Sequence, residues 1–376
     1  MVKRKRILFL IESLNIGGAE KALISLLRQF DYNRFDVTLE LIAETGGFLG
    51  ELKKIPNLKV KRRIRRSKNG AQRIYNKFKS KLIYQWLPKQ NVGNFLCKRY
   101  DTVIAFTEGY LTKWVGASTV KCKKIAWVHT DMVDNDWPTA TGIFSSVEEE
   151  AQCYSKFDEV IGVSNFVSKG VCEKFRYPEV KTIYNLLDPE IIEKANSTQI
   201  HLSDAEYNAV AVGRLEHVKG FDILIEAINL IVKKGDINFK LTIVGDGRER
   251  DSLQALVDKY KIREYVVFKG FKQNPYPYIQ ASDLFICPSR REGFNIAILE
   301  AMRLGKPIVS TEAVGPKEIL NDGEFGIITR SDSQALATGI IKMLETNNLN
   351  QYKELSIQRS KDFNSESGLH ELYSIL

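Results

Sequence analysis

The sequence predicts an α/β protein made of two domains, each built on a parallel β-sheet. Its 376 residues are too many for one typical domain and fit two of about 150–200 residues each. Short, almost continuously apolar runs alternate with helical patterns, as expected for parallel strands that are covered on both faces. The alternation begins again near residue 208, after a polar stretch. We therefore predict domains at residues 1–187 and 188–376.

The first half contains five predicted strands and one clear helix. The helix is expected over residues 20–30, because Ala22, Leu23, Leu26 and Leu27 recur at helical spacing. A turn at residues 15–19 precedes it and contains Gly17 and Gly18. The strands are expected at residues 7–11, 37–42, 101–106, 124–128 and 159–163.

The second half repeats this pattern with its own first strand. Helices are expected at residues 221–233 and 248–260, and strands at 208–213, 240–244, 266–268, 284–287 and 307–310. Ligands of open α/β sheets bind at the carboxyl ends of the strands. Here those ends carry glycine or small polar residues, namely Gly213, Gly245, Gly270, Ser289 and Thr311.

Composition narrows the class of protein further. The five cysteines form no CxxC pair and the four histidines are scattered, so we expect reduced thiols and no metal site. The apolar run at residues 7–11 is too short for a signal peptide or a membrane span, and we expect a cytoplasmic protein. No short repeat or low-complexity tract is present.

The positive charge is concentrated in one segment. Residues 53–100 contain 16 Lys or Arg and no Asp or Glu, whereas the net charge of the whole chain is only +9. Within this segment Ile74, Phe78 and Trp86 belong to an apolar series at three- and four-residue spacing, which predicts a basic amphipathic helix on an anionic membrane. The alternative is a helix whose apolar face packs on its own domain. No motif supports nucleic-acid binding, and we predict none.

The segment of residues 290–302 places two glutamates eight positions apart, just before and inside a predicted helix. Glu292 adjoins Gly293 and Phe294, and Glu300 lies about two turns into the helix. A carboxylate accepts hydrogen bonds from a sugar diol, and amides at a helix start bind phosphate. An isolated pair at this spacing is common by chance and is compatible with two solvated glutamates. The flanking residues are therefore decisive.

This segment resembles the E-x7-E signature of the retaining GT-B glycosyltransferases of family 4. Further segments resemble that family in the same order along the chain. In the first half these are the G-G-A-E loop ending at Glu20, the strand-end motif W-V-H-T-D containing His129, and V-S at residues 163–164. In the second half they are G-R-L at 213–215 with Lys219-Gly220, V-G-D-G at 244–247, and the turn at 268–271 that ends in Phe271. Together they cover essentially the whole chain.

The resemblance implies a GT-B fold, with two Rossmann-like domains facing a central cleft. It also implies transfer of a sugar from a nucleotide diphospho-sugar, and UDP is the commonest nucleotide of such donors. Arg214 and Lys219 would stabilise the leaving diphosphate without a metal or other cofactor. Glu292 and His129 would position the sugar, and Glu300 would accept the ribose hydroxyls. The donor would also contact Gly17, Gly18, Gly245, Phe271, Gly293, Phe294 and Asn295. The last helix, around residues 368–376, is expected to return to the N-terminal domain.

Two positions depart from the family pattern. The interdomain motif reads Asn185-Leu186-Leu187-Asp188, without the usual glycine, and Asn295 stands where many members carry glycine or proline. With the basic segment, the resemblance predicts a lipid-linked saccharide acceptor at the inner face of a bacterial membrane, in capsule or other cell-envelope polysaccharide synthesis. The alternatives are a GT-B epimerase and a non-catalytic sugar-nucleotide sensor. A nicotinamide-dependent enzyme is disfavoured because residues 15–20 lack G-x-G-x-x-G.

Overall fold

The computed structural model describes residues 4–67, 69–133, 137–235 and 237–376. The chain forms two compact units. Unit 1 consists of residues 1–186 together with 365–376, and unit 2 consists of residues 187–364.

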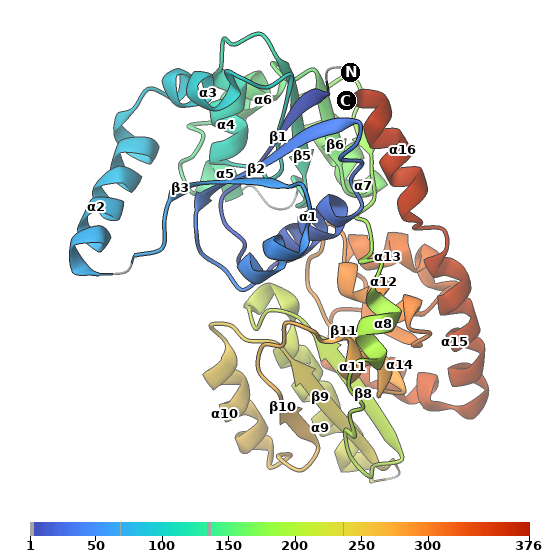
Figure 1. Ribbon diagram of the computed structural model, residues 1–376. Helices are drawn as coiled ribbons and strands as arrows, with labels where there is room; N and C mark the ends of the chain where they lie inside the picture. The colour runs from blue at the N-terminus through green and yellow to red at the C-terminus, as the bar shows by residue number, and fades with distance from the viewer. Residues whose placement is uncertain (1–3, 68, 134–136, 236) are drawn as a thin grey trace. The chain divides into compact units, whose positions relative to one another are not determined.

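Unit 1 is built on a parallel sheet of seven strands in the order β3-β2-β1-β4-β5-β6-β7 (Figure 1). Its central strands are buried on both faces, which is why they read as unbroken apolar runs; residues 7–10 of β1 are completely inaccessible. The strands are β1 (Lys5–Ile11), β2 (Phe35–Ala43), β3 (Lys59–Ile64), β4 (Thr102–Ala105), β5 (Lys123–Val128), β6 (Glu159–Gly162) and β7 (Lys181–Thr182).

The helices of unit 1 include the last helix of the chain. Tyr373 in α16 packs edge to face on Phe30, with ring centroids 5.3 Å apart, and its hydroxyl accepts a hydrogen bond from the Asp31 amide at 2.8 Å. The helices are α1 (Gly18–Arg28), α2 (Gly70–Lys81), α3 (Lys89–Cys97), α4 (Tyr110–Ala117), α5 (Trp137–Ala140), α6 (Val147–Tyr154), α7 (Asn165–Phe175) and α16 (Ser365–Ile375).

Unit 2 has a parallel sheet of six strands in the order β10-β9-β8-β11-β12-β13. The strands are β8 (Tyr207–Val212), β9 (Phe239–Val244), β10 (Val266–Phe268), β11 (Leu284–Cys287), β12 (Ile308–Thr311) and β13 (Ile327–Thr329). The helices are α8 (Ile191–Asn196), α9 (Phe221–Lys234), α10 (Arg250–Tyr260), α11 (Tyr276–Gln280), α12 (Ile296–Arg303), α13 (Val314–Ile319), α14 (Ser333–Leu344) and α15 (Thr346–Ser360).

The core of unit 2 is formed in part by helices that have one apolar face. The buried faces of α9 and α14 lie in one apolar cluster with strands β8 and β9, so the sheet is covered as its apolar strands require.

The prediction of two parallel-sheet α/β domains is confirmed. The sequence interpretation missed the strands β3, β7 and β13 and several helices, among them α4, α7 and α14. The sequence of β3 is dominated by Lys and Arg. No helix in the described ranges combines the length and the apolar character that are needed to cross a membrane.

Candidate functional site

The candidate site in unit 2 begins at the carboxyl edge of its sheet. Strands β8 and β9 run in register to Val212 and Val244, and each is followed directly by a glycine. Gly245 has a φ of +156°, and a Cβ at this position would lie 1.8 Å from the carbonyl oxygen of Gly213. Any other residue would push the two strand ends apart, so the close approach of these turns depends on glycine.

Lys219 and Glu292 are 73 positions apart in the sequence but meet at this edge. The ammonium group of Lys219 forms an ion pair and hydrogen bond with Oε1 of Glu292. Gly220 makes this possible, because its φ is +65° and a Cβ would lie 2.0 Å from the carbonyl oxygen of Pro288. The side chains of Lys219 and Glu292 are only 22% and 11% exposed, so water screens their attraction weakly.

Asn295 and Ser289 complete the environment of this carboxylate. The Asn295 amide nitrogen donates to Oε1 of Glu292 at 3.1 Å, and the Ser289 hydroxyl donates to the same atom at 3.2 Å. The Asn295 side-chain oxygen accepts from the Ile298 amide at 3.2 Å and so caps the start of α12. One buried side chain therefore fixes both the helix start and the glutamate.

Arg290 is a positioning residue that the sequence interpretation missed. Its guanidinium forms two hydrogen bonds with the Asp222 carboxylate, at 2.7 and 2.5 Å, and also donates to the His217 carbonyl at 2.8 Å. Burial opposes ionisation of Asp222, but the bonds and charge of Arg290 outweigh it and lower the pKa of that carboxyl. The clamp joins the turn before α9 to the loop that carries Glu292. Asp222 lies in the first turn of α9, but no local pattern in the sequence pairs it with Arg290.

Glu300, the second glutamate of the motif, is 1% exposed and lies in α12. Its Oε1 accepts a hydrogen bond from the hydroxyl of Tyr276, the first residue of α11, at 3.0 Å. Phe294 is also buried and packs on Phe363, with ring centroids 6.0 Å apart. Phe271 is half-buried just after β10.

Arg214 is exposed after β8, and no carboxylate in the described ranges pairs with its guanidinium. Lys219 and Arg214 thus follow the same strand but differ in state: the first is held by Glu292, and the second is available to an anion. Two cations that follow the same strand end suit a phosphate-bearing ligand.

Unit 1 carries the other predicted residues at the carboxyl edge of its own sheet. Gly17 is the residue before α1 and has an extended backbone, and a Cβ on it would clash with the Glu20 carboxylate at 2.2 Å. A Cβ on Gly18 would meet nothing within 4 Å. The start of α1 is therefore open at Gly18, as ligand approach requires.

His129 follows β5 and is fixed by a buried carboxylate that the sequence interpretation also missed. Oε1 of Glu108 accepts hydrogen bonds from the main-chain amides of His129 and Thr130 at 2.5 and 2.7 Å. Burial lowers the pKa of His129 to about 3, so its imidazole is neutral at physiological pH. Its Nε2 is buried without a partner in the described part of unit 1, and the ring lies against Phe106 with centroids 4.8 Å apart. Glu108 follows β4, which neighbours β5, but an isolated Thr-Glu-Gly gives no sequence signal.

The structure thus joins Lys219, Glu292 and Asn295 by direct bonds, and Arg214 is exposed after β8, the strand that also precedes Lys219. Apart from Glu300, which lies inside α12, each unit holds its predicted residues near the carboxyl ends of its strands. Among the described residues, no group of three or more His, Cys, Asp or Glu is arranged to hold a metal ion.

Comparison with known proteins identifies the family and the fold. The family of "Glycosyl transferases group 1" matches residues 193–359, which contain the Lys219–Glu292 site. HepE of Anabaena, solved in complex with UDP and glucose, has a similar fold with a TM-score of 0.78, at 22% identity over 99% of both chains.

Two relatives are similar in sequence. An uncharacterized glycosyltransferase of Methanocaldococcus jannaschii is 33% identical over 274 residues, covering 68% of this chain and 69% of the relative. The N-acetylgalactosamine-N,N'-diacetylbacillosaminyl-diphospho-undecaprenol 4-alpha-N-acetylgalactosaminyltransferase of Campylobacter jejuni is 31% identical over 215 residues, covering 56% of this chain and 57% of the relative. The chain belongs to the group 1 glycosyl transferases.

Proposed function

We propose that this chain is a retaining, metal-independent glycosyltransferase of family 4 that moves a sugar from a UDP-sugar to the hydroxyl of a lipid-linked saccharide. The observation that carries the proposal is the pair of cations after β8, with Lys219 held by Glu292 and Arg214 free. HepE was solved with UDP, which supports a uridine donor, and the Campylobacter relative acts on a saccharide linked to diphospho-undecaprenol.

In the proposed reaction, the bond between the anomeric carbon and the diphosphate oxygen breaks while the acceptor oxygen bonds to the same face of the sugar. The acceptor's proton passes to the leaving phosphate. Negative charge grows on the diphosphate as the bond breaks, so Lys219 and Arg214 stabilise the transition state more than the ground state. Because His129 is neutral, it positions a sugar hydroxyl by hydrogen bonding and carries no charge.

The proposed location is the cytoplasmic face of a bacterial membrane, where the enzyme would be peripherally bound and serve capsule or other envelope polysaccharide synthesis. Residues 53–100 support this, because α2 has no buried residue and leaves Ile74, Tyr75 and Phe78 73%, 60% and 53% exposed. The alternative interpretation requires the apolar face of α2 to pack on unit 1. The exposure of these three side chains argues against such packing.

The test is nucleotide release from a panel of UDP-, GDP- and ADP-sugars, with and without membrane lipid extract and with excess chelator. Release from one UDP-sugar that rises with lipid and survives the chelator supports the proposal. Donor consumption without a glycoside product indicates an epimerase. Tight donor binding without any release indicates a sensor. The anomeric configuration of the product, read by NMR, decides between retention and inversion.

A further inference from the structure

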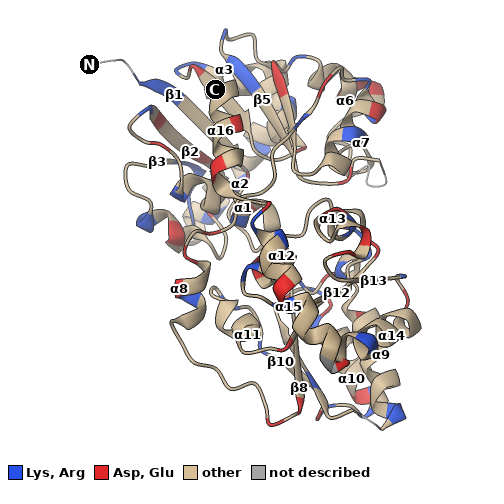
Figure 2. Cartoon of the chain, turned by 90° about the vertical axis from the view of Figure 1, so that its right-hand side faces the viewer, with Lys and Arg blue, Asp and Glu red and all other residues tan. Residues whose placement is uncertain are grey.

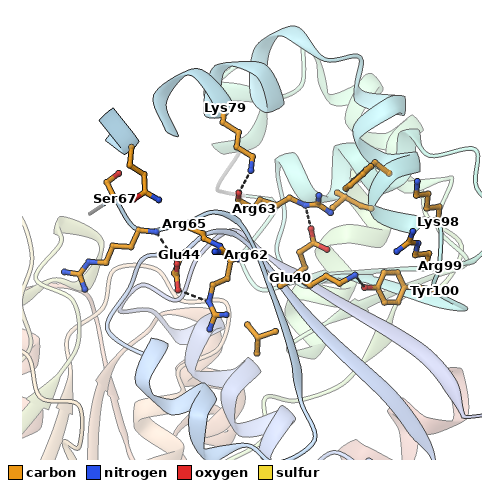
Figure 3. Close-up of a pocket in the computed structure, with 16 residues that line it drawn as sticks. Glu40, Glu44, Arg62, Arg63, Arg65, Ser67, Lys79, Lys98, Arg99 and Tyr100 are labelled. Atoms are coloured by element: carbon orange, nitrogen blue, oxygen red, sulfur yellow. Dashed lines mark hydrogen bonds and ion pairs between the residues drawn. The ribbon is translucent and has the colours of Figure 1, made fainter. Parts of the chain in front are cut away.

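A basic pocket lies in unit 1, on the edge strand β3 and beside α2 and the end of α3 (Figure 3). Its volume is about 1200 Å³. Eight of the residues that line it are Lys or Arg, and two are Glu: Lys61, Arg62, Arg63, Arg65, Arg66, Lys79, Lys98, Arg99, Glu40 and Glu44. Figure 2 marks the Lys and Arg residues of the chain in blue and the Asp and Glu residues in red.

The two glutamates are already neutralised by the wall itself. Glu40 pairs with Arg63, and Glu44 forms an ion pair with Arg62 at 2.8 Å. The remaining arginines, Arg65, Arg66 and Arg99, have no carboxylate partner for their guanidinium groups anywhere in the described ranges. They are also exposed, and so are free to bind an anion.

Hydrogen bonds hold the pocket in shape without pairing the guanidinium groups of these three arginines. Lys79 of α2 donates to the Arg63 carbonyl at 2.7 Å, and Asn76 donates to the Arg65 carbonyl at 2.6 Å. Lys61 donates to the Tyr100 hydroxyl at 2.8 Å. One stripe of α2 therefore faces β3 and fixes the backbone that presents the arginines.

A second stripe of α2 is apolar and points away from β3. Ile74, Tyr75 and Phe78 lie on it, and Trp86 in the following turn packs edge to face on Phe78, with ring centroids 5.4 Å apart, while staying 56% exposed. Lys77 and Lys81 are exposed on the adjoining side of the helix. Apolar and aromatic residues beside lysines are suited to the boundary between lipid headgroups and acyl chains.

We propose that this pocket binds the diphosphate that joins the saccharide of the acceptor to its lipid, while the lipid chain follows the apolar stripe of α2 into the membrane. The juxtaposition is specific, because it places a cavity with surplus guanidinium groups beside an exposed apolar surface. A diphosphate directly attached to a long apolar chain meets both requirements. Guanidinium groups also match phosphate oxygens in paired hydrogen bonds.

Other anions fit the surface less well. A free nucleotide has no apolar chain that could contact the apolar stripe. A nucleic-acid backbone needs an extended basic surface rather than a pocket bounded by α2. An ordinary anionic phospholipid offers one phosphate and is expected to bind through the exposed lysines of α2. The inference rests on the proposed lipid-linked acceptor.

The binding experiment uses farnesyl diphosphate as a soluble probe, with saturating UDP present to occupy any nucleotide site. Farnesol and inorganic diphosphate are the comparison ligands. We expect farnesyl diphosphate to bind about tenfold or more tightly than either, since each has only half of the recognised chemistry. The triple variant R65S/R66S/R99S should lose about tenfold or more of this affinity. The matched control K233S/K234S/K342S, which removes three exposed lysines from unit 2, should bind as the wild type does.

Equal loss in the pocket variant and the control would overturn the proposal, because net charge alone would then explain binding. Vesicles containing phosphatidylglycerol, bound as tightly as vesicles of equal charge that contain undecaprenyl diphosphate, would overturn it as well. Nucleotide release in the same preparations separates the two proposals. If release depends on lipid extract while farnesyl diphosphate does not bind, the pocket assignment fails and the transferase stands. If the probe binds through the pocket but no donor releases nucleotide, the pocket stands and the transferase fails.

Discussion

The side-chain amide of Asn295 lies 3.1 Å from Oε1 of Glu292, and the same side chain caps helix α12 through the Ile298 amide. This double role gives the departure from the glycine or proline of the family pattern a structural basis. The Asn295 amide restrains the Glu292 carboxylate, which in turn binds the Lys219 ammonium group. A substitution at residue 295 is therefore expected to alter the position of Lys219.

Substitution at Asn295 should separate these two roles. Asn295→Ser keeps a capping oxygen but is too short to reach Glu292, so we expect kcat/KM for nucleotide release to fall by about tenfold with little loss of stability. Asn295→Ala removes the cap as well and should cost about a further 1 kcal/mol in the free energy of unfolding. Urea unfolding and steady-state kinetics measure the two effects. Equal kinetics for wild type and Asn295→Ser would show that this hydrogen bond does not position Glu292.

Removal of the Lys219 ammonium should affect catalysis far more than folding. In Lys219→Ala the Glu292 carboxylate still accepts hydrogen bonds from Ser289 and Asn295, so the loop should remain in place. We expect kcat to fall by about two to three orders of magnitude, as for loss of a group that stabilises transition-state charge. Nucleotide release and circular dichroism provide the two readouts.

Lys233→Ala is the matched control for this variant, since Lys233 is exposed at the end of α9 and belongs to no site. Its rate should equal that of the wild type. An unchanged rate in Lys219→Ala would remove this residue from the catalytic assignment.

Sequence reasoning succeeded where one physical signal dominated. The doubly covered strands read as apolar runs, and the predicted strand at residues 284–287 coincides with β11. It failed for β3, because this edge strand carries Lys59, Lys61 and Arg63 and buries little. The pairing of β3 with β2 depends on acidic partners there: Asp36 binds Lys59, and Glu40 binds Arg63. Such partners are visible only after the strands are in register.

The candidate site shows the same limit. Lys219 and Glu292 were identified from their motifs, but their ion pair joins segments from two different strand ends. Arg290, Asp222 and Glu108 act by fixing loops. Arg290 and Glu108 contact backbone groups far away in sequence, and Asp222 binds the Arg290 side chain. No local pattern encodes such contacts, so the positioning residues emerged only with the tertiary structure.

The Arg290–Asp222 clamp should stabilise unit 2 in a pH-dependent manner. The folded-state pKa of Asp222 is lowered, so its contribution is present above the unfolded value, near pH 4, and is lost as the pH falls through the lower folded value. We expect Asp222→Asn to reduce the free energy of unfolding by about 1 kcal/mol between pH 5 and 8, given the partial exposure of both side chains. The deficit should shrink below pH 4. Urea titrations of both proteins measure it, and a deficit that grows toward acid would contradict the assigned ion pair.

His129 should make the protein sensitive to acid in a different range. Its pKa is lowered from 6.5 to about 3 by burial, so the folded state binds fewer protons than the unfolded state below about pH 6.5. Stability is therefore complete above that pH and is lost progressively as the pH falls toward 3. His129→Gln has no group to protonate and should remove this part of the acid sensitivity.

The measurement is the pH dependence of the unfolding free energy for wild type and His129→Gln between pH 4.5 and 7.5, a range to which Asp222 contributes little. The two curves should run parallel above about pH 6.5 and diverge below it, with the wild type falling faster. His370→Gln is the control, because His370 is exposed in α16 and should leave the wild-type curve unchanged. Parallel curves for wild type and His129→Gln throughout would mean that the imidazole is solvated, and the neutral positioning role assigned to it would be wrong.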